Sequence, residues 1–226
     1  MRLFLPLVFS LVLAASPAVS ATADDVLAQM DQAAPKFSGL SADLRRTTYT
    51  KVLDEKALET GTMLLRRGTP RDLQVWINFT TPDPKTIVFR GRKAEIYYPK
   101  MSTIEDWDLG KHSDLVNQFL ALGFGSTGRD LKANYGIRYA GEETISGEQA
   151  HKLELTPSSP QTRQNIARIE LWISEKGSYP LQQQIIKPSG DYYLFTYANV
   201  RVNPAIDAEA LRLKAPKGTK RVSPQK

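Results

Sequence analysis

The chain of 226 residues is long enough to bury a sizeable core, and with 41% hydrophobic and 24% charged residues it is not a disordered protein. It contains no cysteine, which excludes disulfides, zinc–thiolate sites, thiol nucleophiles and an N-terminal lipidated cysteine. The formal net charge of +6 indicates that the protein binds an anionic membrane surface or an acidic partner. We expect no nucleic-acid partner, because an exported protein rarely meets nucleic acid.

Residues 1–21 have the pattern of a secretory signal peptide. Arg2 supplies a positive charge, residues 3–15 are apolar, and small residues follow before cleavage after Ala21 or, alternatively, Ala23. The apolar stretch is shorter than the roughly 20 residues that a transmembrane anchor needs. We therefore expect an exported and soluble mature protein.

After the signal, the pattern predicts a helix followed by strands. Residues 24–37 place apolar side chains at helical spacing, with Asp24 or Asp25 as the N-cap and Pro35 at the end. From residue 40 onwards apolar and polar residues alternate, which is typical of half-buried strands. We expect strands at 40–52, 57–67, 72–82, 85–91, 93–100 and 102–110, the first two forming a hairpin.

The middle of the chain interrupts this alternation. Ser113 is a plausible N-cap, apolar residues then recur at helical spacing up to Leu122, and Gly123 and Gly125 end the run. The glycine-rich stretch 123–128 lacks the Lys-Ser/Thr of a phosphate loop and follows a helix instead of opening one. We expect it to be a hinge or a cap.

The second half returns to strands joined by short turns. Strands are expected at 135–145, 148–157, 165–175, 179–188 and 191–203, and a turn, helix or last strand at 204–216. No linker divides the chain, so we expect one domain over 22–216. Ten or eleven strands in one antiparallel sheet should curl toward a barrel. The pattern of the basic residues 217–226 indicates a flexible tail, either simply solubilising or in contact with a membrane.

The sequence offers no constellation typical of a catalytic or metal site, and we expect neither enzyme activity nor a cofactor. His112 and His151 lack any metal-ligand spacing, and no serine elbow, phosphate loop or dinucleotide fingerprint is present. The acidic group at 105–108 is split by strand alternation, which places Glu105 with Trp107 and the two aspartates on the other face. We expect exposed acids and a packed Trp107.

A curled sheet with a short apolar helix leaves two interpretations of its inner face. The face could hold a hydrophobic ligand under the helix, or its own side chains could fill it as a packed core.

The order of several motifs resembles the outer-membrane lipoprotein carrier family, the LolA-like periplasmic proteins. The matching stretches are "KFSGLSADLRR", the glycine-led strand "GTMLLRR", the Pro-acid, strand, Gly-turn and aromatic-pair segment "PDPKTIVFRGRKAEIYYP", and the ending "NPAIDAEALRLKAPKGTKRV". Each motif is degenerate, but their order together with an export signal and no cysteine is fairly specific. The resemblance covers most of the mature chain.

This resemblance implies a mainly β protein with a few helices, built as a half-open, strongly curled antiparallel barrel with helices as a lid over a hydrophobic cavity. It implies a periplasmic carrier, a chaperone for the acyl chains of lipoproteins on their way to the outer membrane. The implied partners are an ATP-driven extractor in the inner membrane and an acceptor at the outer membrane, and we expect a monomer. The alternatives are a carrier of a free lipid or glycolipid, and a lipoprotein-sensing interaction domain of the same fold.

The family's latch arginine, which hydrogen-bonds to the lid backbone, corresponds to Arg67. Arg67 shares a strand face with Gly61, Met63 and Leu65, and Arg66 should face outward. A guanidinium suits this role because its donors satisfy several carbonyls and stay charged. The family usually has Pro after this arginine and an aromatic soon after, whereas here a Gly-Thr-Pro-Arg insertion intervenes. A register slip would transfer the role to Arg66, and two merely exposed arginines are the remaining alternative.

The ligand-contacting residues expected on this basis come from the strands around the latch and from the lid helix. They are Met63, Leu65, Arg67, Leu73, Val75, Ile77, Phe79, Ile87 and Phe89 on the walls, and Leu115, Phe119, Leu122 and Phe124 on the lid.

Overall fold

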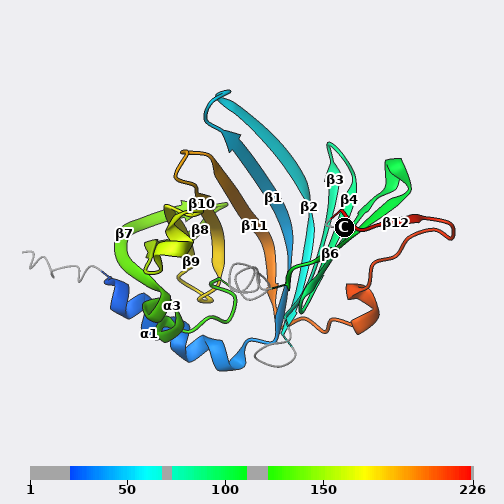
Figure 1. Ribbon diagram of the computed structural model, residues 1–226. Coiled ribbons are helices and arrows are strands. Elements are labelled where there is room, and N and C mark those ends of the chain that lie inside the picture. Colours follow the sequence, from blue (N-terminus) through cyan, green and yellow to red (C-terminus); the bar gives the residue numbers. More distant parts are fainter. Residues whose placement is uncertain (1–20, 68–72, 111–121, 225–226) are drawn as a thin grey trace, which may run out of the picture.

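The computed structural model describes residues 21–67, 73–110 and 122–224, and it is dominated by one long curled sheet (Figure 1). The strands of the first half are β1 (Gly39–Thr50), β2 (Glu55–Arg67), β3 (Leu73–Thr81), β4 (Lys85–Arg90), β5 (Lys93–Tyr98) and β6 (Thr103–Asp108). Those of the second half are β7 (Tyr135–Ile145), β8 (Glu148–Pro157), β9 (Arg168–Ser174), β10 (Pro180–Ile186), β11 (Tyr192–Val202) and β12 (Lys220–Val222).

The twelve strands follow the order β12-β6-β5-β4-β3-β2-β1-β11-β10-β9-β8-β7. All pairings are antiparallel except that between β12 and β6. Because β12 and β7 stand at opposite ends of this order, the sheet is curled but not closed. Figure 1 shows β7–β10 and β3–β6 as two wings on either side of β1, β2 and β11. The expected fold class, a mainly β protein with an open, curled antiparallel sheet, is confirmed.

Helices are short and few. Among the described residues they are α1 (Ala23–Ala33), α3 (Gly128–Asn134) and α4 (Pro160–Arg163), with 3-10 turns η1 (Ala34–Lys36), η2 (Pro99–Met101) and η4 (Ala208–Leu211). In the described part of the chain, no helix has both the length and the apolar character needed to cross a membrane.

The first helix begins at Ala23, before either of the two aspartates expected to cap it. Thr22 is its N-cap, and its side chain and that of Asp25 form a reciprocal capping box. The expectation of an Asp24 or Asp25 cap is therefore wrong, since Asp25 occupies the third helical position. Pro35 lies in the 3-10 turn that continues α1.

The glycine-rich stretch at 123–128 opens a helix, contrary to expectation. Thr127 caps α3 and forms a capping box with Asp130, a threonine-to-acid spacing visible in the sequence. Gly128 sits against α1, where an added Cβ would lie 2.6 Å from the carbonyl oxygen of Leu27. The close approach of α1 and α3 explains why glycine stands there.

The C-terminal segment is not simply a tail. Lys220–Val222 form β12 beside β6, so the expectation of a flexible tail over 217–226 is wrong for these residues. Arg221 supports the pairing through ion pairs with Glu95 of β5 and Asp106 of β6. The basic residue Arg221 therefore helps to hold β12 against the acidic side chains of β5 and β6.

Two large apolar clusters line the inner face of the sheet. One joins α1, α3 and strands β7–β9, and the other joins β1–β4 with Tyr197 of β11. Strand alternation explains both, since the residues that each strand contributes to its cluster lie at every second position.

Candidate ligand-binding face

Most of the residues expected to contact ligand come together on the inner face of β2–β4. Met63, Leu65, Leu73, Val75, Ile77, Phe79 and Ile87 lie in one buried cluster that also contains Phe124, and Phe89 packs against it. The register of the strands produces this arrangement, because Met63 pairs with Ile77 and Ile77 with Ile87 across neighbouring strands. Leu115 and Phe119 lie outside the described residues, as does His112.

The segment Leu122–Gly125 covers part of this face. Phe124 is fully buried, and its ring meets that of Tyr197 edge-on with centroids 5.1 Å apart. Leu122 packs instead into the cluster formed by α1, α3 and β7–β9. The two expected lid residues therefore enter different clusters, and the short segment between them connects the two sides of the inner face.

Arg67 and Arg66 point to different partners, as strand alternation predicts. Arg67 Nη1 donates a hydrogen bond of 2.7 Å to the carbonyl oxygen of Gly125. Arg66 Nη2 donates one of 2.8 Å to Oε1 of Gln74, its cross-strand neighbour on β3. Only the first of these bonds reaches the covering segment.

Gly125 has the conformation and the surroundings that glycine alone tolerates. Its φ of +67° is in the left-handed region, and an added Cβ would lie 2.6 Å from the Phe37 ring and 3.1 Å from Arg67 Nη1. The bond from Arg67 therefore reaches the carbonyl at a point where the chain is tightly enclosed.

Gln183 of β10 is a second anchor of the same segment, and apolar alternation alone does not predict it. Its Nε2 donates to the carbonyl oxygen of Leu122, and its Oε1 accepts a hydrogen bond of 2.7 Å from the hydroxyl of Tyr197. Both side chains are buried, and burial raises the pKa of the Tyr197 hydroxyl far above its ordinary range, so it stays a donor. A glutamine two positions before the inward Ile185 is the signal available in the sequence.

A pocket of about 400 Å³ opens beside the bond between Arg67 and Gly125. Its walls include Met30 of α1, Phe37, Gly125 and Tyr179. The pocket lies where α1 and η1 meet the covering segment, so it marks a hollow at this end of the inner face.

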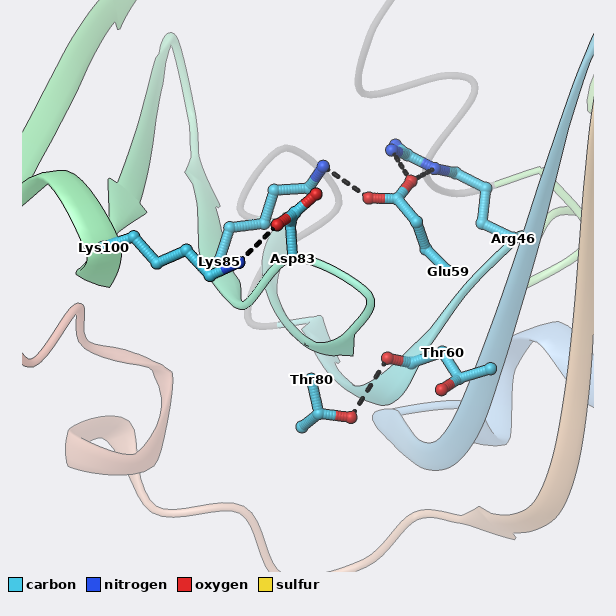
Figure 2. Close-up of polar contacts among 7 residues, drawn as sticks. All are labelled: Arg46, Glu59, Thr60, Thr80, Asp83, Lys85 and Lys100. Atoms are coloured by element: carbon cyan, nitrogen blue, oxygen red, sulfur yellow. Dashed lines mark hydrogen bonds and ion pairs between the residues drawn. The ribbon is translucent and has the colours of Figure 1, made fainter. Parts of the chain in front are cut away.

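A charged group lies at the other end of the strands, on the same face. Figure 2 shows Glu59 of β2 between Arg46 of β1 and Lys85 of β4. Both cations form ion pairs with Glu59, that of Lys85 at 2.5 Å. Burial alone would raise the pKa of Glu59, but the hydrogen bond from Lys85 and the charge of Arg46 outweigh it and lower the pKa.

The acidic and histidine side chains considered as candidate catalytic or metal-binding residues make hydrogen bonds and ion pairs with neighbouring side chains. Trp107 is half-buried and donates to Glu105, while Asp106 holds Arg221. His151 is buried, with Nδ1 3.2 Å from the hydroxyl of Tyr139. Across residues 21–67, 73–110 and 122–224, no group of His, Cys, Asp or Glu side chains could hold a metal ion.

Comparison with known proteins gives the chain a family. The family model described as "Outer membrane lipoprotein carrier protein LolA" matches residues 36–214. No curated protein sequence matches the chain.

Solved structures resemble the chain in fold alone. MucB superposes with a TM-score of 0.55 at 16% identity, covering 85% of this chain and 63% of MucB. An uncharacterized conserved protein from Thermus thermophilus gives 0.53 at 14% identity, covering 89% of this chain and 98% of that one. In the Pseudomonas aeruginosa MucA/MucB complex the values are 0.50 and 15%, over 85% of this chain and 61% of the other. The chain therefore spans less than two thirds of the length of MucB.

Proposed function

Because the chain belongs to the outer membrane lipoprotein carrier (LolA) family, we propose that it is a non-enzymatic periplasmic carrier that holds acyl chains against the inner face of its sheet. The observation that carries the proposal is the arrangement of that face. A continuous apolar surface from β1–β4 is covered by a short segment that contributes one aromatic ring, Phe124.

Cargo would replace this segment. Phe124 leaves the face, and acyl methylenes take over its contacts with Tyr197 and the strand residues. Burial of each methylene contributes about 0.8 kcal/mol, which is enough to hold a lipid and still release it to a better acceptor. Because cover and cargo make similar contacts, the exchange needs no large driving force.

Arg67 acts as the latch in this proposal. Its bond to Gly125 supports the assignment, and the engagement of Arg66 with Gln74 argues against a register slip. Gln183 holds the other end of the same segment through Leu122. Opening the cover therefore requires that two polar side chains on different strands release backbone carbonyls, which cargo or water must then satisfy.

The proposed route is that of the family. The carrier, a monomer, takes an acylated lipoprotein from an ATP-driven extractor in the inner membrane and delivers it to an acceptor at the outer membrane. Signal cleavage after Ala21 or Ala23 would release the carrier into the periplasm.

Native mass spectrometry of the protein purified from an envelope fraction, combined with lipid extraction, tests this function. A co-purifying triacylated protein is the expected result. A free acyl lipid in its place would keep carriage but select the alternative cargo. A protein that neither carries nor exchanges any acylated molecule would refute the proposal.

A further inference from the structure

Arg46, Glu59 and Lys85, here called the charged triad, interrupt the apolar inner face at one end. Arg46 continues the inward positions Leu40, Ala42 and Leu44 of β1, and Glu59 precedes Gly61 and Met63 on β2. The triad lies far from the latch. Arg67 lies eight positions after Glu59 along β2, a distance of about 26 Å at a rise of roughly 3.3 Å per residue.

The two cations are held against the apolar surface itself. Arg46 Cζ lies 4.8 Å and Lys85 Nζ 5.4 Å from the centroid of the Phe79 ring, which is fully buried. The side chains of Arg46, Lys85 and Glu59 are 23%, 19% and 13% exposed. These charged side chains are therefore largely removed from water, but each stays partly exposed to solvent at the end of the inner face.

The charge of the triad is not balanced. Within the described residues, Glu59 is the carboxylate that contacts both cations, so positive charge exceeds negative charge by one. The nearby pair of Lys100 and Asp83 is neutral as a unit and strongly exposed, at 66% and 73%. A half-buried excess cation beside an apolar surface favours an anion that carries its own apolar part.

We propose that the charged triad binds the anionic headgroup of an acyl lipid whose chains lie along the apolar inner face. The inference rests on the proposed acyl-carrier function and adds free anionic lipids to the cargo that the face accepts. The guanidinium of Arg46 on β1 offers a fork of donors to a phosphate or carboxylate, and Lys85 supplies a point charge from β4, which β3 separates from β2. Glu59 occupies the same donors and so competes with the headgroup, setting the affinity of the site.

Lipids that share acyl chains but differ in headgroup test the proposal. The full-length mature protein is incubated with phosphatidylglycerol, phosphatidylcholine or diacylglycerol in detergent micelles, and retention is read by native mass spectrometry. We expect phosphatidylglycerol to be preferred over diacylglycerol by about tenfold, and the preference to fall with added salt. Inorganic phosphate alone should bind far more weakly than phosphatidylglycerol.

Variants separate headgroup binding from a merely structural ion pair. Arg46→Gln and Lys85→Gln should each reduce the preference about five- to tenfold, whereas Glu59→Gln should increase it because it frees both cations. Lys100→Gln, which removes a cation from an exposed pair, is the matched control and should leave the preference unchanged. A structural role would instead make all three triad variants less stable without changes of opposite sign in lipid preference.

The outcomes distinguish this inference from the function on which it rests. Equal retention of phosphatidylglycerol and diacylglycerol, or loss of preference in Glu59→Gln, overturns the headgroup site and leaves acyl carriage standing. Retention of no lipid at all refutes both. If Arg46→Gln does not fold, Lys85→Gln and Glu59→Gln still decide the question through their opposite expected effects.

Discussion

The side chain of Arg67 and the backbone of Gly125 are joined by a hydrogen bond of 2.7 Å that spans 58 positions of the chain. The bond connects the last residue of β2 to the segment that covers the apolar inner face. The contact is broken by competition for the guanidinium donor or by movement of the segment.

Arg67→Leu should leave the protein folded and accelerate release of acyl cargo. The change removes a charge-assisted hydrogen bond, typically about 1–3 kcal/mol, from the covered state. The measurement is the rate at which a pyrene-labelled diacyl lipid passes from the protein to acceptor vesicles. Arg66→Leu is the matched control, because Arg66 binds only a neighbouring strand residue among the contacts described for it, and it should have little effect. Equal, negligible effects of both variants would contradict the latch.

Gly125→Ala should destabilise the covering segment more than glycine replacement elsewhere. Left-handed backbone costs an alanine about 1–2 kcal/mol, and here the new methyl group also meets Phe37 and Arg67. Gly147→Ala is the control, since Gly147 has a φ of +85° and nothing within 4 Å of its added Cβ. Urea denaturation should show a larger loss of unfolding free energy for Gly125→Ala. Similar losses for the two variants would mean that the enclosure of Gly125 does not add to the destabilisation.

Phe124→Ala should increase the affinity for acyl chains while lowering stability. Truncation of a buried Phe typically costs about 3–5 kcal/mol, and in this protein it also vacates the surface that cargo would use. Leu153→Ala, a fully buried change in the other cluster, should lower stability without raising affinity. Thermal unfolding and titration with a fluorescent fatty acid measure the two effects. A fall in affinity in Phe124→Ala would show that Phe124 belongs to a permanent core.

The charged triad should contribute to acid sensitivity through Glu59. The pKa of Glu59 is lowered below its ordinary value of 4.5, so its contribution is fully present above that pH and is lost as the pH falls through the lowered pKa. Wild-type protein should therefore lose more unfolding free energy than Glu59→Gln between neutral pH and pH values below 4.5. Urea denaturation across this range provides the comparison. Parallel curves for the two proteins would contradict the predicted coupling.

Alternation of apolar and polar residues was sufficient to predict most of the sheet, because each strand has one buried face and a shift of one residue would expose it. The hairpin of β1 and β2 is an example, with Leu40 opposite Leu65 and Thr50 opposite Glu55. Apolar periodicity does not predict the short helix α3, although the spacing of its capping residues, Thr127 and Asp130, is visible in the sequence.

Other features depend on contacts that sequence spacing does not encode. Strand β12 has three residues, and its place beside β6 depends on Arg221 meeting acids more than a hundred positions away. Gln183 and the charged triad are polar residues at inward positions, which alternation alone marks as exceptions without giving them partners. Their roles emerge only when the curled sheet brings Leu122 to Gln183 and Glu59 between Arg46 and Lys85.

The division of Leu122 and Phe124 between two clusters has a mechanical consequence. Leu122 packs in the cluster of α1, α3 and β7–β9, and Phe124 packs in the cluster of β1–β4 and Tyr197, so this short segment joins the two clusters. If cargo displaced this segment, as proposed, the two clusters would lose a shared packing contact at the same time.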